Sequence, residues 1–257
     1  MPHNNSTFRV WATRPTKQNT AWQKRLESAG YEVFACPFLE IKPLKDQAVI
    51  EQTKQKILNL DLYKKLIFVS QNAVNFGFEW IEDYWPQLPL GIDFFAVGAA
   101  TAKALRSREV TVIENSVAMN SQALLELDLL REVEGEKILI FRGQGGLTVL
   151  GDTLLNRGAL VEYCELYQRA APDGLVETLR SQDNQRHPQD IIPIFSGEAL
   201  KNFEKGALLA GLNCYDRRII VPGERVEKLA NAAGFKDVTV AINASEDAMF
   251  NCLANFV

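Results

Sequence analysis

The chain repeats itself at an offset of 128 residues, and this repeat limits its possible folds more than any other feature. Arg142 lies 128 positions after Arg14, and the segment ILIFRG (138–143) follows the pattern of VWATRP (10–15). Other matched pairs are Leu26 with Leu154, Gly30 with Gly158, Val33 with Val161 and Cys36 with Cys164. Solenoid repeats have much shorter periods, about 20–50 residues. The repeat therefore predicts two copies of one whole domain, with a site between them.

Later segments continue the repeat with small gaps. LIFVSQNAV (66–74) resembles IIPIFSGEAL (191–200), and each apolar run closes with a serine, Ser70 or Ser196. A chain of 257 residues is long enough for two domains that each bury a core. We therefore expect the two serines to occupy equivalent places in the two copies.

Short apolar runs alternate with polar turns and amphipathic stretches along the chain. In the first half, strands buried on both faces are predicted at 8–12, 31–35, 65–70, 93–98 and 110–113. In the second half, strands are predicted at 136–143, 159–167, 190–196, 217–223 and 236–242. Helical spacing is found at 20–30, where Gly30 is expected to end the helix, and at 100–109. This alternation predicts an α/β fold with two similar flavodoxin-like or Rossmann-like domains, each with a parallel sheet and right-handed crossovers.

Two proline-containing segments interrupt this rhythm. CPFLEIKPL (36–44) contains two prolines, and YCELYQRAAP (163–172) ends in one. Each directly follows or overlaps the equivalent second strand of its copy. Because proline disfavours a helix, both segments are predicted to be extended and to serve as linkers.

Composition excludes several functions. The net charge is −4 and no basic stripe with aromatic residues is present, which argues against nucleic acid as a partner. No apolar stretch approaches the roughly 20 residues of a membrane span, and the N-terminal pattern is not that of a signal peptide, so a cytoplasmic protein is expected. The four cysteines lie far apart and predict buried free thiols rather than a zinc site or disulfides.

Candidate ligand-binding residues follow the predicted strands, because open parallel sheets bind ligands at the carboxyl ends of their strands. They include Thr13, Arg14, Ser70, Asn72, Gly98, Thr101, Arg142 and Ser196. At such turns the backbone N–H groups of the next helix favour an anion, so carboxylates or phosphates are expected. The alternatives stay open: both serines could cap helices, and both arginines could pair with glutamates.

Familiar catalytic groups are missing from these positions. His3 and His187 lie in polar segments and are not expected to act as general bases. The glycine-rich RGQGGL (142–147) lacks the spacing of a nucleotide-binding motif. No serine has the GxSxG surroundings of a nucleophile, and no carboxylate pair is evident. Any chemistry is therefore expected to come mainly from the substrate.

In the order and spacing of its motifs the chain resembles the uroporphyrinogen-III synthase family over nearly its whole length. The matching motifs are TRP (13–15), S-x-N-A-V (70–74), A-V-G-x-x-T-A (96–102), the strand from Gly158 to Tyr167, SGEAL (196–200) and ASEDAM (244–249). VPGERV (221–226) departs from the family pattern, so a role of Arg225 is left open.

The resemblance implies that the sequence repeats and the spatial domains differ. One domain would combine residues 1–35 with 173–257, and the other would span 42–164. Segments 36–41 and 165–172 would pair as a two-stranded linker. Arg14 and Arg142 would then line opposite walls of one cleft.

The resemblance also implies the reaction. Hydroxymethylbilane, a linear tetrapyrrole, would lose its hydroxyl and close to uroporphyrinogen III with its last ring inverted, without a cofactor or a metal. The eight residues named above would bind the substrate. Tyr167 would act as a weak acid that helps the hydroxide to leave; the alternative is that Tyr167 only packs on the linker. We expect a monomer and a hand-over from the preceding pathway enzyme. The alternative is a non-catalytic two-domain binding or sensor protein for an anionic metabolite.

Overall fold

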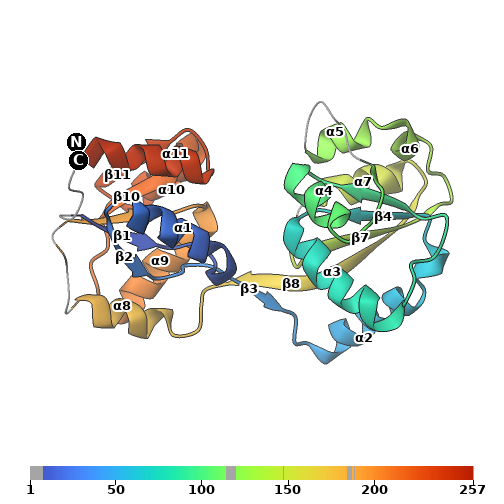
Figure 1. Ribbon diagram of the computed structural model, residues 1–257, viewed down its shortest axis with the longest axis horizontal. Coiled ribbons are helices and arrows are strands. Elements are labelled where there is room, and N and C mark those ends of the chain that lie inside the picture. Colours follow the sequence, from blue (N-terminus) through green and yellow to red (C-terminus); the bar gives the residue numbers. More distant parts are fainter. Residues whose placement is uncertain (1–7, 114–119, 147, 184–186, 188, 257) are drawn as a thin grey trace. The chain divides into compact units, whose positions relative to one another are not determined.

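A computed structural model describes residues 8–113, 120–146, 148–183, 187 and 189–256 (Figure 1). The chain divides into two compact units. The first unit combines Met1–Ile41 with Ala170–Val257, and the second unit is Lys42–Arg169. The described segments nearest the two termini, blue and red in Figure 1, thus belong to the same unit.

The first unit contains a five-stranded sheet in the order β11-β10-β9-β1-β2, in which all neighbouring strands run parallel. The strands are β1 (Arg9–Ala12), β2 (Glu32–Ala35), β9 (Asp190–Pro193), β10 (Arg218–Pro222) and β11 (Asp237–Ala241). The helices are α1 (Thr16–Ser28), α8 (Leu175–Asp183), α9 (Gly197–Ala210), α10 (Gly223–Ala233), α11 (Glu246–Asn251) and the 3₁₀ helix η3 (Cys252–Phe256). Neighbouring strand residues enter different apolar clusters: Val10 packs with Trp22, and Trp11 packs with Phe203. Because strand side chains alternate between faces, the sheet has a core on both sides.

The second sheet has six strands in the order β3-β8-β7-β4-β5-β6. The strands are β3 (Glu40–Pro43), β4 (Lys65–Phe68), β5 (Asp93–Ala96), β6 (Val112–Ile113), β7 (Lys137–Gly143) and β8 (Leu160–Ala170). The helices are α2 (Gln47–Leu58), the 3₁₀ helix η2 (Leu60–Leu62), α3 (Gln71–Tyr84), α4 (Ala99–Arg106), α5 (Ser121–Leu125), α6 (Asp128–Arg131) and α7 (Val149–Asn156). Strands β4 to β8 pair in parallel. The predicted α/β class with parallel sheets is confirmed, and every predicted strand is present.

The sequence repeat is also a structural repeat. The amide of Tyr31 donates to the Leu26 carbonyl at 3.2 Å, and the amide of Ala159 donates to the Leu154 carbonyl at 3.1 Å. Gly30 and Gly158 precede these amides with φ values of 84° and 85°, which glycine adopts without a steric cost. The turn from helix to second strand is therefore the same in both copies.

The two copies are divided between the two units. The first unit contains β1 and β2 from the first copy and β9 to β11 from the second copy. The second unit contains β4 to β6 from the first copy and β7 and β8 from the second copy. Read in matching order, the sheets are β2-β1-β9-β10-β11 and β8-β7-β4-β5-β6. The proline-containing segments are extended as predicted, and β3 lies beside β8 in the second sheet.

The expectation that every strand is buried on both faces is wrong for the sheet edges. The residues of β2 and of β6 are exposed or only partly buried, whereas all four residues of β1, β4 and β9 are buried. β2 and β6 each lie at an edge of their sheet, so each has a neighbouring strand on one side only. Helix α1 also begins at Thr16, earlier than predicted, because the carbonyl of its N-cap residue Pro15 accepts from the amides of Gln18 and Asn19 at 2.8 and 3.0 Å.

Three of the four free cysteines are buried, as predicted: Cys36, Cys164 and Cys214; Cys252 is partly buried. Burial raises the pKa of Cys36 to about 12, because the thiolate would lose its hydration. Within the described residues, none of the helices is both long and apolar enough to cross a membrane.

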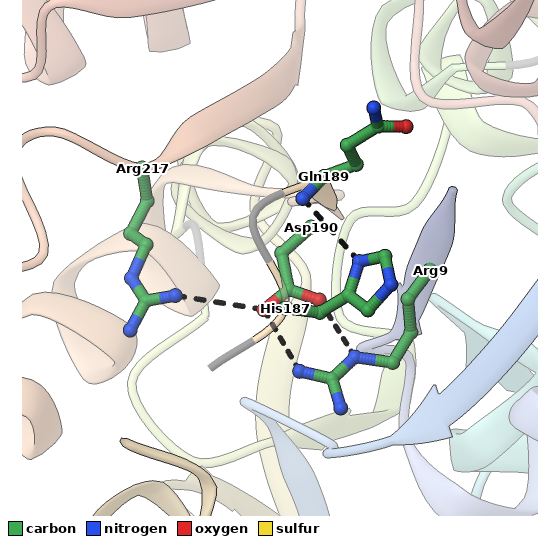
Figure 2. A network of polar contacts seen from close by, with 5 residues as sticks. All are labelled: Arg9, His187, Gln189, Asp190 and Arg217. Atoms are coloured by element: carbon green, nitrogen blue, oxygen red, sulfur yellow. Dashed lines mark hydrogen bonds and ion pairs between the residues drawn. The ribbon is translucent and has the colours of Figure 1, made fainter. Parts of the chain in front are cut away.

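A buried ionic network lies at the amino ends of β1 and β9 (Figure 2). The Arg9 guanidinium donates to both carboxylate oxygens of Asp190, at 2.7 Å from Nε and 2.9 Å from a terminal nitrogen. Arg217 donates to the same carboxylate at 3.5 Å. The hydrogen bond to Asp190 raises the pKa of Arg9, although burial alone would lower it. One carboxylate therefore holds two buried cations and ties β1 to the start of β9.

Replacing this carboxylate tests its contribution to stability. Asp190→Asn keeps the shape of the side chain but leaves the buried guanidinium of Arg9 without its anionic partner, so we expect a loss of about 3 kcal/mol in unfolding free energy. The control is Asp237→Asn, because the Arg218–Asp237 pair at 3.3 Å is largely exposed and should contribute less than about 1 kcal/mol. Urea titration followed by circular dichroism measures both changes. Equal effects of the two substitutions would contradict this assignment.

Candidate functional site

The predicted site residues lie at the carboxyl ends of the strands in both units. In the first unit, Thr13 and Arg14 follow β1, and Ser196 lies between β9 and α9. The second unit places the others around the ends of four strands: Ser70 and Asn72, Gly98 and Thr101, Arg142, and Tyr167. Each unit therefore brings its own predicted residues to one edge of its sheet.

Tyr167 lies inside the second unit rather than on its surface, with only 1% of the residue exposed. The pairing of β7 with β8 shifts at this point: Arg142 pairs with Glu165, but Gly143 pairs with Tyr167. β8 thus carries one extra residue, a bulge that redirects the side chain that follows it. As a result the phenol oxygen lies 2.8 Å from the Ser70 hydroxyl oxygen, within hydrogen-bonding distance.

Two further residues fix the Tyr167 ring. Phe76 of α3 stacks on it, with 5.5 Å between the ring centroids and 23° between the planes. A methyl group added to Gly143 would lie 2.6 Å from Cε2 of the same ring, so the backbone of β7 reaches the ring only because this residue is glycine. Neither Phe76 nor Gly143 is among the site residues predicted from the sequence. The glycines of RGQGGL (142–147) are the only sequence signal near this ring, and that segment resembles a nucleotide-binding motif more than a packing site.

Ser70 and Ser196 are helix N-caps, which is one of the alternatives left open from the sequence. The Ser70 hydroxyl accepts from the Ala73 amide at 3.0 Å, and the Ser196 hydroxyl accepts from the Ala199 amide at 3.1 Å. Each cap begins a helix of 14 residues. A direct contact of either serine with a substrate stays a prediction.

Arg14 is held by several groups of the first unit. Its guanidinium donates to Gln18 at 2.9 Å, forms an ion pair with Glu246, and lies 4.9 Å from the centre of the Phe195 ring. About 19% of the side chain is exposed, so the guanidinium keeps some access to solvent. The neighbouring Thr13 is buried, and its hydroxyl donates to the carbonyl of Pro193.

Arg142 has a similar set of partners in the second unit. It forms an ion pair with Glu165 at 3.5 Å, donates to the Gly146 carbonyl, and lies 4.6 Å from the centre of the Tyr163 ring. The glutamate pairing considered from the sequence is therefore present for both arginines. Because an aromatic ring and a carboxylate fix each guanidinium, both are oriented before any ligand arrives.

The remaining second-unit residues shape the turns after β4 and β5. Gly98 has a φ of 95° and begins α4, a conformation that favours glycine. Thr101 is buried and donates to the Val97 carbonyl at 2.9 Å, whereas Asn72 is partly exposed in the first turn of α3. The divergent turn after β10 has Gly223 at its start, with a φ of 70°, and an exposed Arg225. The turn after β10 therefore has a glycine at the start of a helix, as the turn after β5 has with Gly98.

The histidines and acidic residues suggest no other centre. His3 lies outside the described residues, and His187 is near the amino ends of the first sheet, where its Nδ1 accepts from the Gln189 amide at 3.3 Å (Figure 2). Among the residues that the structure describes, no three of His, Cys, Asp or Glu are grouped to hold a metal ion. The predicted strand-end residues remain the candidate site.

A methyl group on Gly143 tests whether Tyr167 is held as tightly as the geometry indicates. Gly143→Ala must displace the ring, which is already stacked on Phe76, so we expect a loss of about 1–3 kcal/mol in unfolding free energy. The control is Gly206→Ala, because a methyl group there would meet only flexible leucine side chains at 3.1 Å. Thermal unfolding compares the two variants. A Gly143→Ala protein as stable as the control would show that the ring can move freely.

Together, the fold and the site define a two-unit α/β protein in which helix starts and oriented arginines at the strand ends can hold an anionic ligand. A sequence model described as "Uroporphyrinogen-III synthase HemD" matches residues 20–251. The chain belongs to the uroporphyrinogen-III synthase family.

Individual relatives agree with this assignment. Uroporphyrinogen-III synthase of Escherichia coli (strain K12) is 32% identical over 257 residues, covering 95% of this chain and 99% of the relative. The Salmonella typhimurium enzyme of the same name is 31% identical with the same coverage. The crystal structure of uroporphyrinogen-III synthetase from Helicobacter pylori 26695 has a TM-score of 0.62 at 16% identity, covering 98% of this chain and 100% of that one. At such low identity, the structural match supports the fold alone.

Proposed function

We infer that this protein is a lyase that cyclises hydroxymethylbilane to uroporphyrinogen III, with loss of water and inversion of the last pyrrole ring, in haem biosynthesis. The family match over residues 20–251 carries this conclusion, and the relatives cover almost the whole chain. The alternative, a non-catalytic binding or sensor protein, is not favoured because the named relatives are synthases.

The chemistry of the substrate explains why the site needs no strong base. Electron-rich pyrrole nitrogens can expel the terminal hydroxyl, and the resulting cation is attacked by the substituted carbon of the last ring to give a spirocyclic intermediate. The enzyme must hold the chain so that this carbon reacts, which is catalysis by positioning. Hydrogen bonds to the departing oxygen provide further stabilisation.

We assign the substrate-binding roles by the kind of group that each residue offers. The guanidinium groups of Arg14 and Arg142 bind substrate carboxylates, because each is already oriented by a ring and a glutamate. The remaining residues form the helix starts that favour an anion: Thr13, Ser70, Asn72, Gly98, Thr101 and Ser196. Thr13 and Thr101 act mainly on the shape of these turns, because their hydroxyls bind backbone carbonyls.

Tyr167 is the proton donor in this proposal. As the C–O bond breaks, the bonding electrons move to the oxygen and the phenol proton joins it, so that water leaves. The substrate keeps a cation delocalised onto the pyrrole nitrogen, and Tyr167 becomes a phenolate. When the ring system regains its pyrrole form, it loses a proton, and the Tyr167 phenolate takes up this proton to become a phenol again. Water is therefore the sole by-product.

Three finer features belong to the same proposal. The enzyme acts in the cytoplasm, works as a monomer, and receives hydroxymethylbilane from the enzyme that produces it. The reason for a hand-over is chemical: the free bilane closes spontaneously without inversion, so rapid capture limits formation of the type I isomer.

The decisive test of the function is the identity of the product. The protein is incubated with enzymatically generated hydroxymethylbilane, and the uroporphyrin isomers are separated after oxidation. We expect the type III isomer in large excess. Formation of only the type I isomer, which also forms without enzyme, would refute the proposed function.

The role of Tyr167 is tested separately with Tyr167→Phe. This change removes only the hydroxyl, so the ring should keep its stacking on Phe76. We expect turnover to fall by about 10-fold or more, at the low end of general acid–base effects. If the variant forms the type III isomer at an unchanged rate, Tyr167 is not the proton donor and only packs in the core, and the proposed enzymatic function still holds.

A further inference from the structure

The Ser70 hydroxyl lies between the start of α3 and the phenol oxygen of Tyr167. It accepts from the Ala73 amide at 3.0 Å and lies 2.8 Å from the phenol oxygen. Both groups therefore use the same oxygen atom of Ser70. The hydroxyl connects the amino-terminal end of a 14-residue helix to the side chain proposed as the proton donor.

The number of available hydrogens limits how this pair can work. A serine hydroxyl has one hydrogen to donate and can accept through its lone pairs. The Ala73 amide can only donate, so Ser70 accepts from it and keeps its own hydrogen. For Tyr167 to give its proton to a leaving hydroxyl, the phenol hydrogen must point away from Ser70. In that arrangement the Ser70 hydroxyl donates to the phenol oxygen.

We propose that Ser70 is a positioning residue that directs the proton of Tyr167 towards the substrate and stabilises the phenolate formed when that proton leaves. This inference rests on the proposed synthase function. The Ser70 O–H donates to the oxygen that gains negative charge, and the Ala73 amide, at the positive end of α3, polarises the same hydroxyl. When the proton returns to the phenolate, the original hydrogen bonds are restored.

The surrounding fold holds the donor and acceptor in place. Ser70 caps α3, and Phe76 of the same helix stacks on the Tyr167 ring. Gly143 in β7 leaves just enough room for the ring, because a methyl group added there would lie 2.6 Å from Cε2 and 2.8 Å from Cζ. A single helix thus supplies both the hydroxyl that binds the phenol and the ring that orients it.

This arrangement is specific to one copy of the repeat. Ser196 caps α9 as Ser70 caps α3, with almost the same extended backbone conformation. However, the residue 128 positions before Tyr167 is Leu39, which has no hydroxyl to bind. The duplicated domain therefore supplied the serine cap twice, but at this position the second copy has a tyrosine where the first copy has a leucine.

Substitutions at Ser70 can separate this role from helix capping. Glycine is nearly as good an N-cap as serine, so Ser70→Gly should keep α3 folded while it removes the hydroxyl. We expect Ser70→Gly to lower kcat by about 10-fold or more, the effect of losing one hydrogen bond to a charged group. KM should change little, because the backbone N–H groups of the helix start, to which substrate binding is assigned, stay in place. Ser70→Thr keeps the hydroxyl and should restore most of the lost rate. The control Asn120→Gly removes a similar cap, from the Ala123 amide at 2.8 Å, and should leave kcat unchanged.

The decisive measurement is the same change in a Tyr167→Phe background. If Ser70 acts through the phenol, Ser70→Gly should cause no further loss of kcat there. An equal loss in both backgrounds, or an unchanged kcat for Ser70→Gly alone, would overturn the proposal. The product of the wild-type protein separates a failure of this proposal from a failure of the synthase function. If the wild type forms the type III isomer, a failed Ser70 test refutes only the role of Ser70.

Discussion

Parallel strand pairing is the constraint on which the arrangement of each unit depends. All strands of the first sheet run parallel, as do β4 to β8 of the second, so their carboxyl ends meet at one edge. Helices that follow these strands begin at that edge and direct their free N–H groups towards it. This explains why segments far apart in sequence, such as those around Ser70 and Tyr167, supply neighbouring groups.

The duplication explains the shared framework, and small departures from it distinguish the site residues of the two units. Equivalent turns at Gly30 and Gly158 have nearly the same φ, and equivalent serines cap α3 and α9. In the second unit, the β8 bulge places Tyr167 opposite Gly143, where its phenol reaches Ser70. The duplicated framework thus has the contact between Ser70 and Tyr167, the proposed proton donor, in its second unit.

The sequence predicted the features that depend on local pattern. Apolar runs gave the strands, and the 128-residue offset predicted the matching turns because both copies use the same glycines and leucines. Exposure of the edge strands could not be predicted in this way, because it depends on the strand order. The contacts of Tyr167 with Phe76 and Gly143 depend on a register shift, and the partner of Arg14 is Glu246, 232 positions away. Such contacts leave no spacing signal in a single sequence.

The glutamate partners of the two arginines bear on how an anion could bind. Glu246 and Glu165 are each about one-third exposed, whereas the guanidinium groups that they hold are more deeply buried. A substrate carboxylate would therefore meet a cation that already has a carboxylate partner, and it would have to share or replace that partner. The cost of desolvating each arginine has already been met within the folded protein, since the neighbouring ring and glutamate stabilise its charge. The proposed binding at these arginines would thus be an exchange between carboxylates rather than the capture of an anion by an unpaired cation. Exchange of this kind suits the proposed substrate hydroxymethylbilane, a tetrapyrrole with eight carboxylates, because no single contact has to hold it.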